Sequence, residues 1–107
     1  MVLAEFESQE NLSRTIGKGV ALIDFNAPWC APCRAQDPII AKLVENYLGR
    51  ARIEKINIDR NQAVAMKLGI QSIPTLILFK GGKEIRRFIG LQSVETLSGA
   101  IDRALRD

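Results

Sequence analysis

Two cysteines, Cys30 and Cys33 in the stretch WCAPC, are the residues whose types and spacing best suit chemistry. If a helix begins at this motif, one helical turn separates them, which brings the two sulfurs within disulfide-forming distance. Cys30 would lie at the helix N-terminus, where unpaired backbone N–H groups and the helix dipole favour a thiolate. Cys33 would lie deeper and ionise less. The motif therefore predicts thiol-disulfide exchange, in which Cys30 attacks and Cys33 resolves the mixed disulfide.

The residues beside the two cysteines favour the same interpretation. Pro32 suits the first turn of a helix, where its missing N–H costs nothing and its fixed φ stiffens the loop between the thiols. Trp29, next to the predicted nucleophile, offers an apolar face to a docking substrate chain. We therefore expect a redox site that needs neither a metal nor an organic cofactor.

The spacing of the cysteine pair is also compatible with three alternative roles. Half of a zinc site has the same spacing, but the sequence holds no histidine and no third cysteine, so only a site shared by a dimer could reach four ligands. A purely structural disulfide would add little stability, because closing so short a loop removes little entropy from the unfolded chain. Two inert buried cysteines would not account for the intervening proline or the position between a strand and a helix.

The elements that must position the motif follow from hydrophobic periodicity. Residues 20–25 are apolar except for Asp24 and predict a central strand buried on both faces. Residues 31–48 carry apolar side chains at helical spacing, with Pro38 expected to kink the helix. Residues 52–58 predict the next strand, and the order strand, helix, strand is that of a right-handed parallel crossover.

The rest of the chain predicts shorter elements. We expect a strand over residues 2–6, a helix capped by Ser8 that carries Leu12 and Ile16, and a short helix over residues 61–68. Gly81-Gly82 separates strands over 75–79 and 84–89, which predicts an antiparallel hairpin. Ser93 caps a last helix with one apolar face, made of Val94, Leu97, Ile101 and Leu105. The predicted class is α/β: one domain over residues 1–107, with a central mixed sheet and helices on both faces.

Composition and charge argue against several other classes of function. The 15 basic and 12 acidic residues are intermixed and give a net charge of +3, so no basic stripe for nucleic acid is expected. The apolar runs are too short to cross a bilayer, and we expect no membrane association. The first ten residues lack the features of a secretory signal, which predicts a cytoplasmic protein. Two cysteines in a reducing compartment are more often redox-active or metal-binding than structural.

Asp24 is the most informative residue outside the motif. A carboxylate buried unpaired within the apolar strand would cost several kcal/mol, so the group should bind its proton tightly. The alternative is a strand-end residue that reaches solvent.

The segments WCAPC, ALIDF, KINIDRN and SIPTLILFKGG together resemble the thioredoxin family, and the similarity runs over residues 2–106. The resemblance implies the thioredoxin fold, with Pro74 as a cis-proline that faces the cysteines. It also implies that Asp24 exchanges a proton with Cys33, and that Lys55 is the lysine on the neighbouring strand.

The resemblance further implies a shallow groove in which a client backbone lies beside the disulfide. Ile73, Pro74 and Gly90 would line this groove together with Trp29. The residues alone do not indicate a cis bond, and without the resemblance Pro74 is an ordinary proline at a strand start and Gly90 a turn residue. Lys55 is equally a solvated surface lysine.

Several residues depart from the usual family pattern. Asn26 stands where many members have tryptophan, and Ala31 replaces the glycine between the first cysteine and the proline. Gln36 and Asp37 add polar and acidic character to the helical turn after Cys33, where apolar and small residues are more usual. Ala31, Pro32 and Lys55 are the residues expected to tune the reduction potential.

We therefore predict a monomeric protein-disulfide reductase whose substrates are disulfide-containing client proteins and whose electron donor is a thioredoxin reductase. One rival hypothesis is the same fold acting as a disulfide oxidase or isomerase. The other is a partner-binding module with incidental redox activity.

Overall fold

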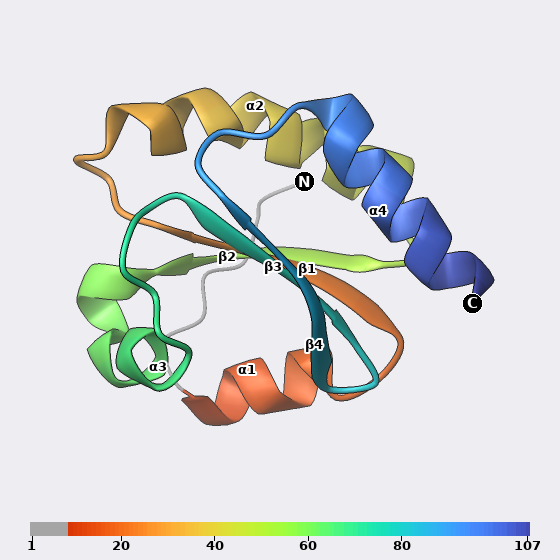
Figure 1. Ribbon diagram of the computed structural model, residues 1–107, viewed down its shortest axis with the longest axis horizontal. Helices are drawn as coiled ribbons and strands as arrows, with labels where there is room; N and C mark the ends of the chain where they lie inside the picture. Colours follow the sequence, from red (N-terminus) through yellow and green to blue (C-terminus); the bar gives the residue numbers. More distant parts are fainter. Residues whose placement is uncertain (1–8) are drawn as a thin grey trace.

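The computed structural model describes residues 9–107, and within them four strands form one mixed sheet in the order β2-β1-β3-β4. Helices α2 and α4 cover one face of the sheet, and α1 and α3 cover the other (Figure 1). The predicted α/β class is therefore confirmed. The elements are α1 Gln9–Ile16, β1 Val20–Asn26, α2 Ala31–Asn46, β2 Arg52–Asn57, the 3-10 helix η1 Ile58–Arg60, α3 Gln62–Lys67, β3 Thr75–Lys80, β4 Lys83–Ile89 and α4 Val94–Arg106.

Strand β1 lies at the centre and pairs with a parallel and an antiparallel neighbour. It runs parallel to β2, which confirms the predicted crossover, and antiparallel to β3. In this register Asp24 lies between Lys55 of β2 and Leu76 of β3. The β3-β4 hairpin is also confirmed. Its turn is Gly81-Gly82 with φ of +59° and +84°, the positive values that a two-residue hairpin loop of this kind requires.

The side chains of β1 alternate between two hydrophobic clusters, because successive residues of a strand point to opposite faces. Val20 and Leu22 pack with residues of α2 and α4, whereas Ile23 and Phe25 pack toward α1 and α3. Each fully buried aliphatic or aromatic side chain contributes about 1.5–3 kcal/mol relative to an exposed one. By the same alternation Asp24 points to the side of α2, the helix that carries Cys33.

Some predicted boundaries were wrong. Helix α2 ends at Asn46 rather than Leu48. Strand β2 ends at Asn57, because the Asn57 side chain accepts a hydrogen bond from the Asp59 N–H at 2.9 Å and caps η1. The strand expected over residues 2–6 and the cap at Ser8 lie outside the described residues. Helix α2 continues through Pro38, and the expected kink there stays a prediction.

The buried face of α4 also differs from the prediction. Leu97 and Ile101 are fully buried, but Leu105 is 36% exposed. Ala100 and Ala104 take its place, since they lie three and seven residues after Leu97, whereas Leu105 lies about 80° further round the helix. Among residues 9–107 no helix is long and apolar enough to cross a membrane.

Candidate active site

Cys30 and Cys33 form a disulfide at the start of α2, with their Cα atoms 5.2 Å apart. Cys30 is the N-cap residue and has an extended backbone, and the N–H of Cys33 points at its Sγ over 3.2 Å. Pro32 lies in the first turn of the helix, as predicted. Both cysteines are buried, with exposures of 5% for Cys30 and 2% for Cys33. A helix terminus that directs an N–H at a sulfur stabilises negative charge on that sulfur.

The segment before β3 faces the disulfide. The Ile73-Pro74 peptide bond is cis, as the family resemblance implies. The carbonyl oxygen of Ile73 lies 3.8 Å from Sγ of Cys30. The carbonyl oxygen of Pro74 accepts a hydrogen bond from the N–H of Gly90 at 2.8 Å. The cis-proline segment, which is distant in sequence, is thus placed directly beside the first sulfur and tied to the loop after β4.

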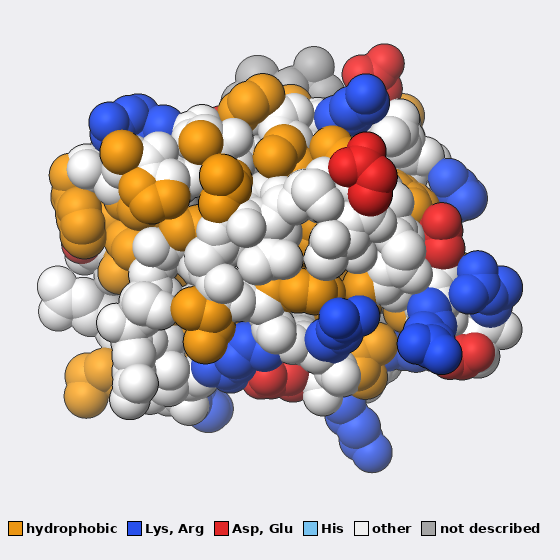
Figure 2. Space-filling model, turned by 45° about the horizontal axis from the view of Figure 1, so that its top comes forward, with side chains coloured by type: hydrophobic (Ala, Val, Ile, Leu, Met, Phe, Trp, Pro, Cys, Tyr) orange, Lys and Arg blue, Asp and Glu red, His pale blue; other side chains and the backbone are white. Residues whose placement is uncertain are grey.

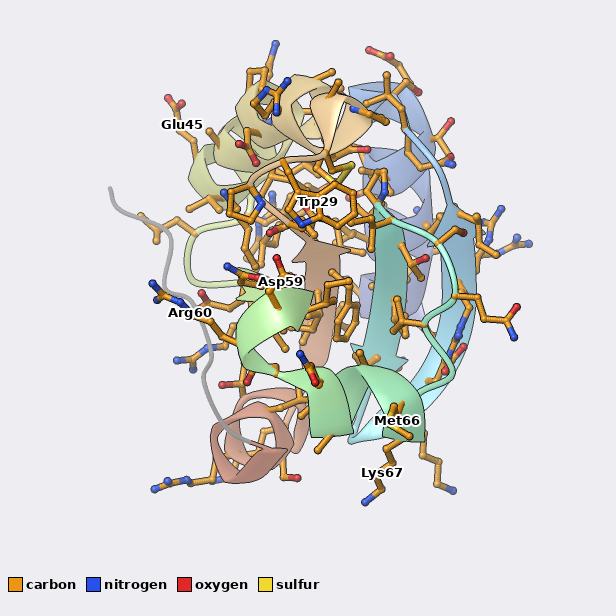
Figure 3. All side chains as sticks on the ribbon, turned by 90° about the vertical axis from the view of Figure 1, so that its left-hand side faces the viewer. Trp29, Glu45, Asp59, Arg60, Met66 and Lys67 are labelled. Carbon is orange, nitrogen blue, oxygen red and sulfur yellow. A yellow bond between two sulfur atoms is a disulfide. The ribbon has the colours of Figure 1, made fainter. Side chains whose placement is uncertain are left out.

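Trp29 is 67% exposed at this end of the molecule, and its indole N–H donates to Oδ2 of Asp59 at 2.9 Å (Figure 3). Asp59 did not stand out in the sequence. The sequence indicates its position only indirectly. Asp59 follows β2 as Trp29 follows β1, and the carboxyl ends of two parallel strands meet at one edge of the sheet. In Figure 2 hydrophobic side chains gather on the left, the end at which α2 begins in Figure 1.

Asp24 is fully buried, which excludes the alternative of a solvent-exposed strand end. Among the described residues, none donates a hydrogen bond to either carboxyl oxygen. The amide of Asn26 donates instead to the backbone carbonyl of Asp24, at 3.3 Å. Burial, and secondly the negative charge of Asp37, raise the pKa of Asp24 from 3.8 to about 7, although Lys55 and the nearby Asn26 act in the opposite direction. The carboxyl group therefore titrates near neutral pH.

Lys55 is paired rather than simply solvated. Its side chain is only 19% exposed, and its Nζ lies 3.0 Å from Oδ1 of Asp37. The ion pair borders a groove of about 280 Å³ that also reaches Cys33. The groove is lined by Asn26, Ala27, Pro28, Cys33, Arg34, Asp37 and Lys55. One of the two cysteines and the charges that act on Asp24 thus share one solvent-accessible space.

Gln36 and Asp37 both lie within α2, inside the helix predicted over residues 31–48. Gln36 is fully buried, and its side-chain amide bonds to the backbone of Gln92. Among the described residues, no group of three or more histidine, cysteine or acidic side chains could hold a metal ion.

Comparisons with known proteins agree with this geometry. The family model for thioredoxin matches residues 3–103. A thioredoxin of Staphylococcus haemolyticus is 39% identical over 98 residues, which are 92% of this chain and 94% of that protein. Thioredoxin 1 of a Nostoc species is 42% identical over 84 residues, 78% of each chain. The solved structure of a mutant thioredoxin from Halobacterium salinarum superimposes with a TM-score of 0.88 at 33% identity and covers 94% of this chain and 88% of that one.

A mixed sheet with helices on both faces, and a redox-active cysteine pair where β1 passes into α2, define a thiol-disulfide oxidoreductase. The chain belongs to the thioredoxin family. Like the thioredoxins it resembles, it reduces protein disulfides through reversible oxidation of the Cys30/Cys33 dithiol. The rival hypotheses, a disulfide oxidase or isomerase and a partner-binding module with incidental redox activity, are not favoured.

Proposed function

We propose that the two cysteines have fixed and different roles in this reduction. The Cys30 thiolate forms a bond to one sulfur of the client disulfide, and the other client sulfur leaves and takes up a proton. The Cys33 thiolate then attacks Sγ of Cys30 and releases the second client thiol, so the client gains two electrons and the protein is left as the disulfide. The observation that supports this assignment is the N-cap position of Cys30, with the N–H of Cys33 directed at its Sγ over 3.2 Å.

Asp24 is proposed as the proton acceptor for Cys33. A group with a pKa of about 7 can accept and return a proton near neutral pH, whereas an ordinary aspartate would stay ionised. Asp24 is buried on the side of β1 that faces α2, and this position supports the role because Cys33, the resolving thiol, lies on α2.

The client backbone is proposed to lie across the surface of Trp29, Ile73, Pro74 and Gly90. The exposure of Trp29 and the 3.8 Å approach of the Ile73 carbonyl to Cys30 support this placement.

Ala31 and Pro32 between the sulfurs, and Lys55 beside Asp24, are proposed to tune the reduction potential. A thioredoxin reductase would return the oxidised protein to the dithiol, and we propose that the protein acts as a monomer in the cytoplasm, as one domain over residues 1–107.

The direct test is a coupled assay with the purified protein, a thioredoxin reductase and NADPH. We expect NADPH consumption that depends on both the protein and a disulfide-bonded client. The equilibrium potential against glutathione should be measured in parallel. A potential as oxidising as that of disulfide isomerases, about −180 mV, would contradict the assignment as a reductase.

A further inference from the structure

Gln36 makes a pair of contacts that joins the active-site helix to the loop after β4. Its side chain is fully buried, three residues after Cys33. Its Oε1 accepts a hydrogen bond from the N–H of Gln92 at 2.8 Å, and its Nε2 donates to the carbonyl oxygen of Gln92 at 2.9 Å. One side-chain amide thus pairs with both backbone groups of a loop residue, as a neighbouring strand would.

The loop over residues 90–92 is held at its other end as well. The N–H of Gly90 donates to the carbonyl oxygen of Pro74 at 2.8 Å. The side chain of Gln92 donates to the carbonyl oxygens of Ile89 and Gly90, at 3.3 and 3.2 Å. The loop is therefore fixed at its first residue to the cis-proline segment and at its last residue to α2.

Leu91 lies between the two fixed points and is 51% exposed. Its backbone is positioned relative to Pro74 on one side and to the helix of Cys33 on the other. An apolar side chain on such a loop can contact an extended client segment that carries its disulfide beside an apolar residue. The position of that contact relative to the sulfur then depends on Gln36.

A hydrocarbon side chain at position 36 would leave the N–H and the carbonyl oxygen of Gln92 without the partners they now have. Gln92 is half-buried, and backbone groups that lose their partners at such a site move toward water to regain them. Cys33 and Gln36 are one helical turn apart, and a displaced loop would no longer keep its place relative to the sulfur.

We propose that Gln36 is a positioning residue for client recognition, which holds the loop over residues 90–92 in place and so sets the affinity for protein clients. It takes no part in sulfur exchange. This inference rests on the proposed function, because it assumes that the loop borders the surface on which the client backbone lies.

The test compares Gln36→Leu with the matched control Gln62→Leu, which replaces an exposed glutamine of α3. Steady-state reduction is measured with a disulfide-bonded protein and with a small aromatic disulfide that does not reach the loop. We expect Gln36→Leu to raise KM for the protein by about tenfold, equivalent to about 1.4 kcal/mol of binding. The value of kcat, and the rate with the small disulfide, should stay within about twofold of wild type, and Gln62→Leu should change neither.

Hydrogen exchange at the Gln92 amide gives a readout independent of activity, and it should accelerate in Gln36→Leu. Gln36→Glu keeps the acceptor for this N–H but loses the donor, so it carries the same test if the leucine variant does not fold. An unchanged KM in a folded variant, or an equal loss on both substrates, would overturn the proposal. Failure of the wild type to reduce either disulfide would instead refute the proposed function.

Discussion

The two faces of strand β1 are equally buried but differ in chemistry. On the side of α1 and α3 every side chain is apolar, whereas on the side of α2 and α4 the strand changes from apolar to polar toward its C-terminal end. The residues are Ala21, Ile23 and Phe25 on the first side, and Val20, Leu22, Asp24 and Asn26 on the second.

This difference shows that the fold places the polar groups of its active site at one end of a strand, so that the loss of stability from burying them is confined to that end. The apolar face and the first half of the other face stabilise the sheet. Buried polar groups are confined to the last residues of the strand, which leads directly into the helix that carries the cysteines. Substitutions on the apolar face should therefore change stability alone, and substitutions around the polar end should change chemistry.

The largest effect is expected from the cysteines themselves. Cys30→Ser should abolish disulfide reduction, because it removes the attacking sulfur. Cys33→Ser should leave attack intact and accumulate a stable mixed disulfide with clients, which mass spectrometry detects. Alkylation of the reduced wild type near neutral pH checks the assignment directly. Modification of Cys33 before Cys30 would show that the two roles are reversed.

The second prediction concerns stability against pH in Asp24→Asn. The pKa of Asp24 is raised to about 7 in the folded protein, so the unfolded state ionises first as the pH rises above about 4. Burial of this ionisable group therefore carries no ionisation cost at low pH, costs progressively more between pH 4 and 7, and reaches its full cost above pH 7. Asparagine removes that cost, so the variant should be more stable near pH 8 by at most about 4 kcal/mol, with the difference vanishing near pH 4.

Denaturant unfolding at pH 4 and pH 8 measures this difference, and single-turnover kinetics should show slower release of the mixed disulfide with a flatter pH profile. Ile23→Ala, the neighbour on the apolar face, is the control. It should lose about 2–5 kcal/mol at both pH values and keep the wild-type pH profile. If Asp24→Asn were markedly less stable at pH 8 with an unchanged profile, Asp24 would be a structural residue.

A smaller effect is expected from Asp37→Asn. Asp37 raises the pKa of Asp24 through its charge and also holds Lys55 at 3.0 Å. Its neutralisation should lower the pKa of Asp24, by less than about one unit because the Asp37 side chain is 43% exposed and screened by solvent. An NMR titration of the Asp24 carboxyl measures the shift. Glu95→Gln, at an exposed site on α4, should leave the titration unchanged, and a shift of equal size there would refute a local role for Asp37.

The smallest effect is expected from Ala31→Gly. Glycine loosens the first turn of α2 and costs at most about 1 kcal/mol in a helix. If that cost falls on only one redox state, the reduction potential should shift by no more than about 20 mV without unfolding, since about 30 mV corresponds to about 1.4 kcal/mol. Equilibration with glutathione gives the value. An identical potential would mean that Asn26 or Asp37 accounts for any special redox character of this protein.

The amino-acid sequence by itself determined the features that depend on neighbouring residues. Hydrophobic periodicity predicted β1, the crossover and the hairpin, and the residue types in WCAPC predicted the helix start and the cysteine pair. The burial of Asp24 followed from its apolar neighbours. The buried face of a helix was less predictable, as with Leu105, because the packing of α4 against its neighbours decides which edge of its apolar face is covered.

Only the tertiary structure decided which polar residues act together. Trp29 and Asp59 are 30 residues apart in sequence, and Gln36 and Gln92 are 56 apart. Lys55 of β2 forms an ion pair with Asp37 of α2. Local patterns carry information about residues within a few positions of one another, and a charged or amide side chain has many acceptable partners. The order of the strands and the placement of α2 over β1 select one of them, so the contacts that tune this site became visible only in the folded chain.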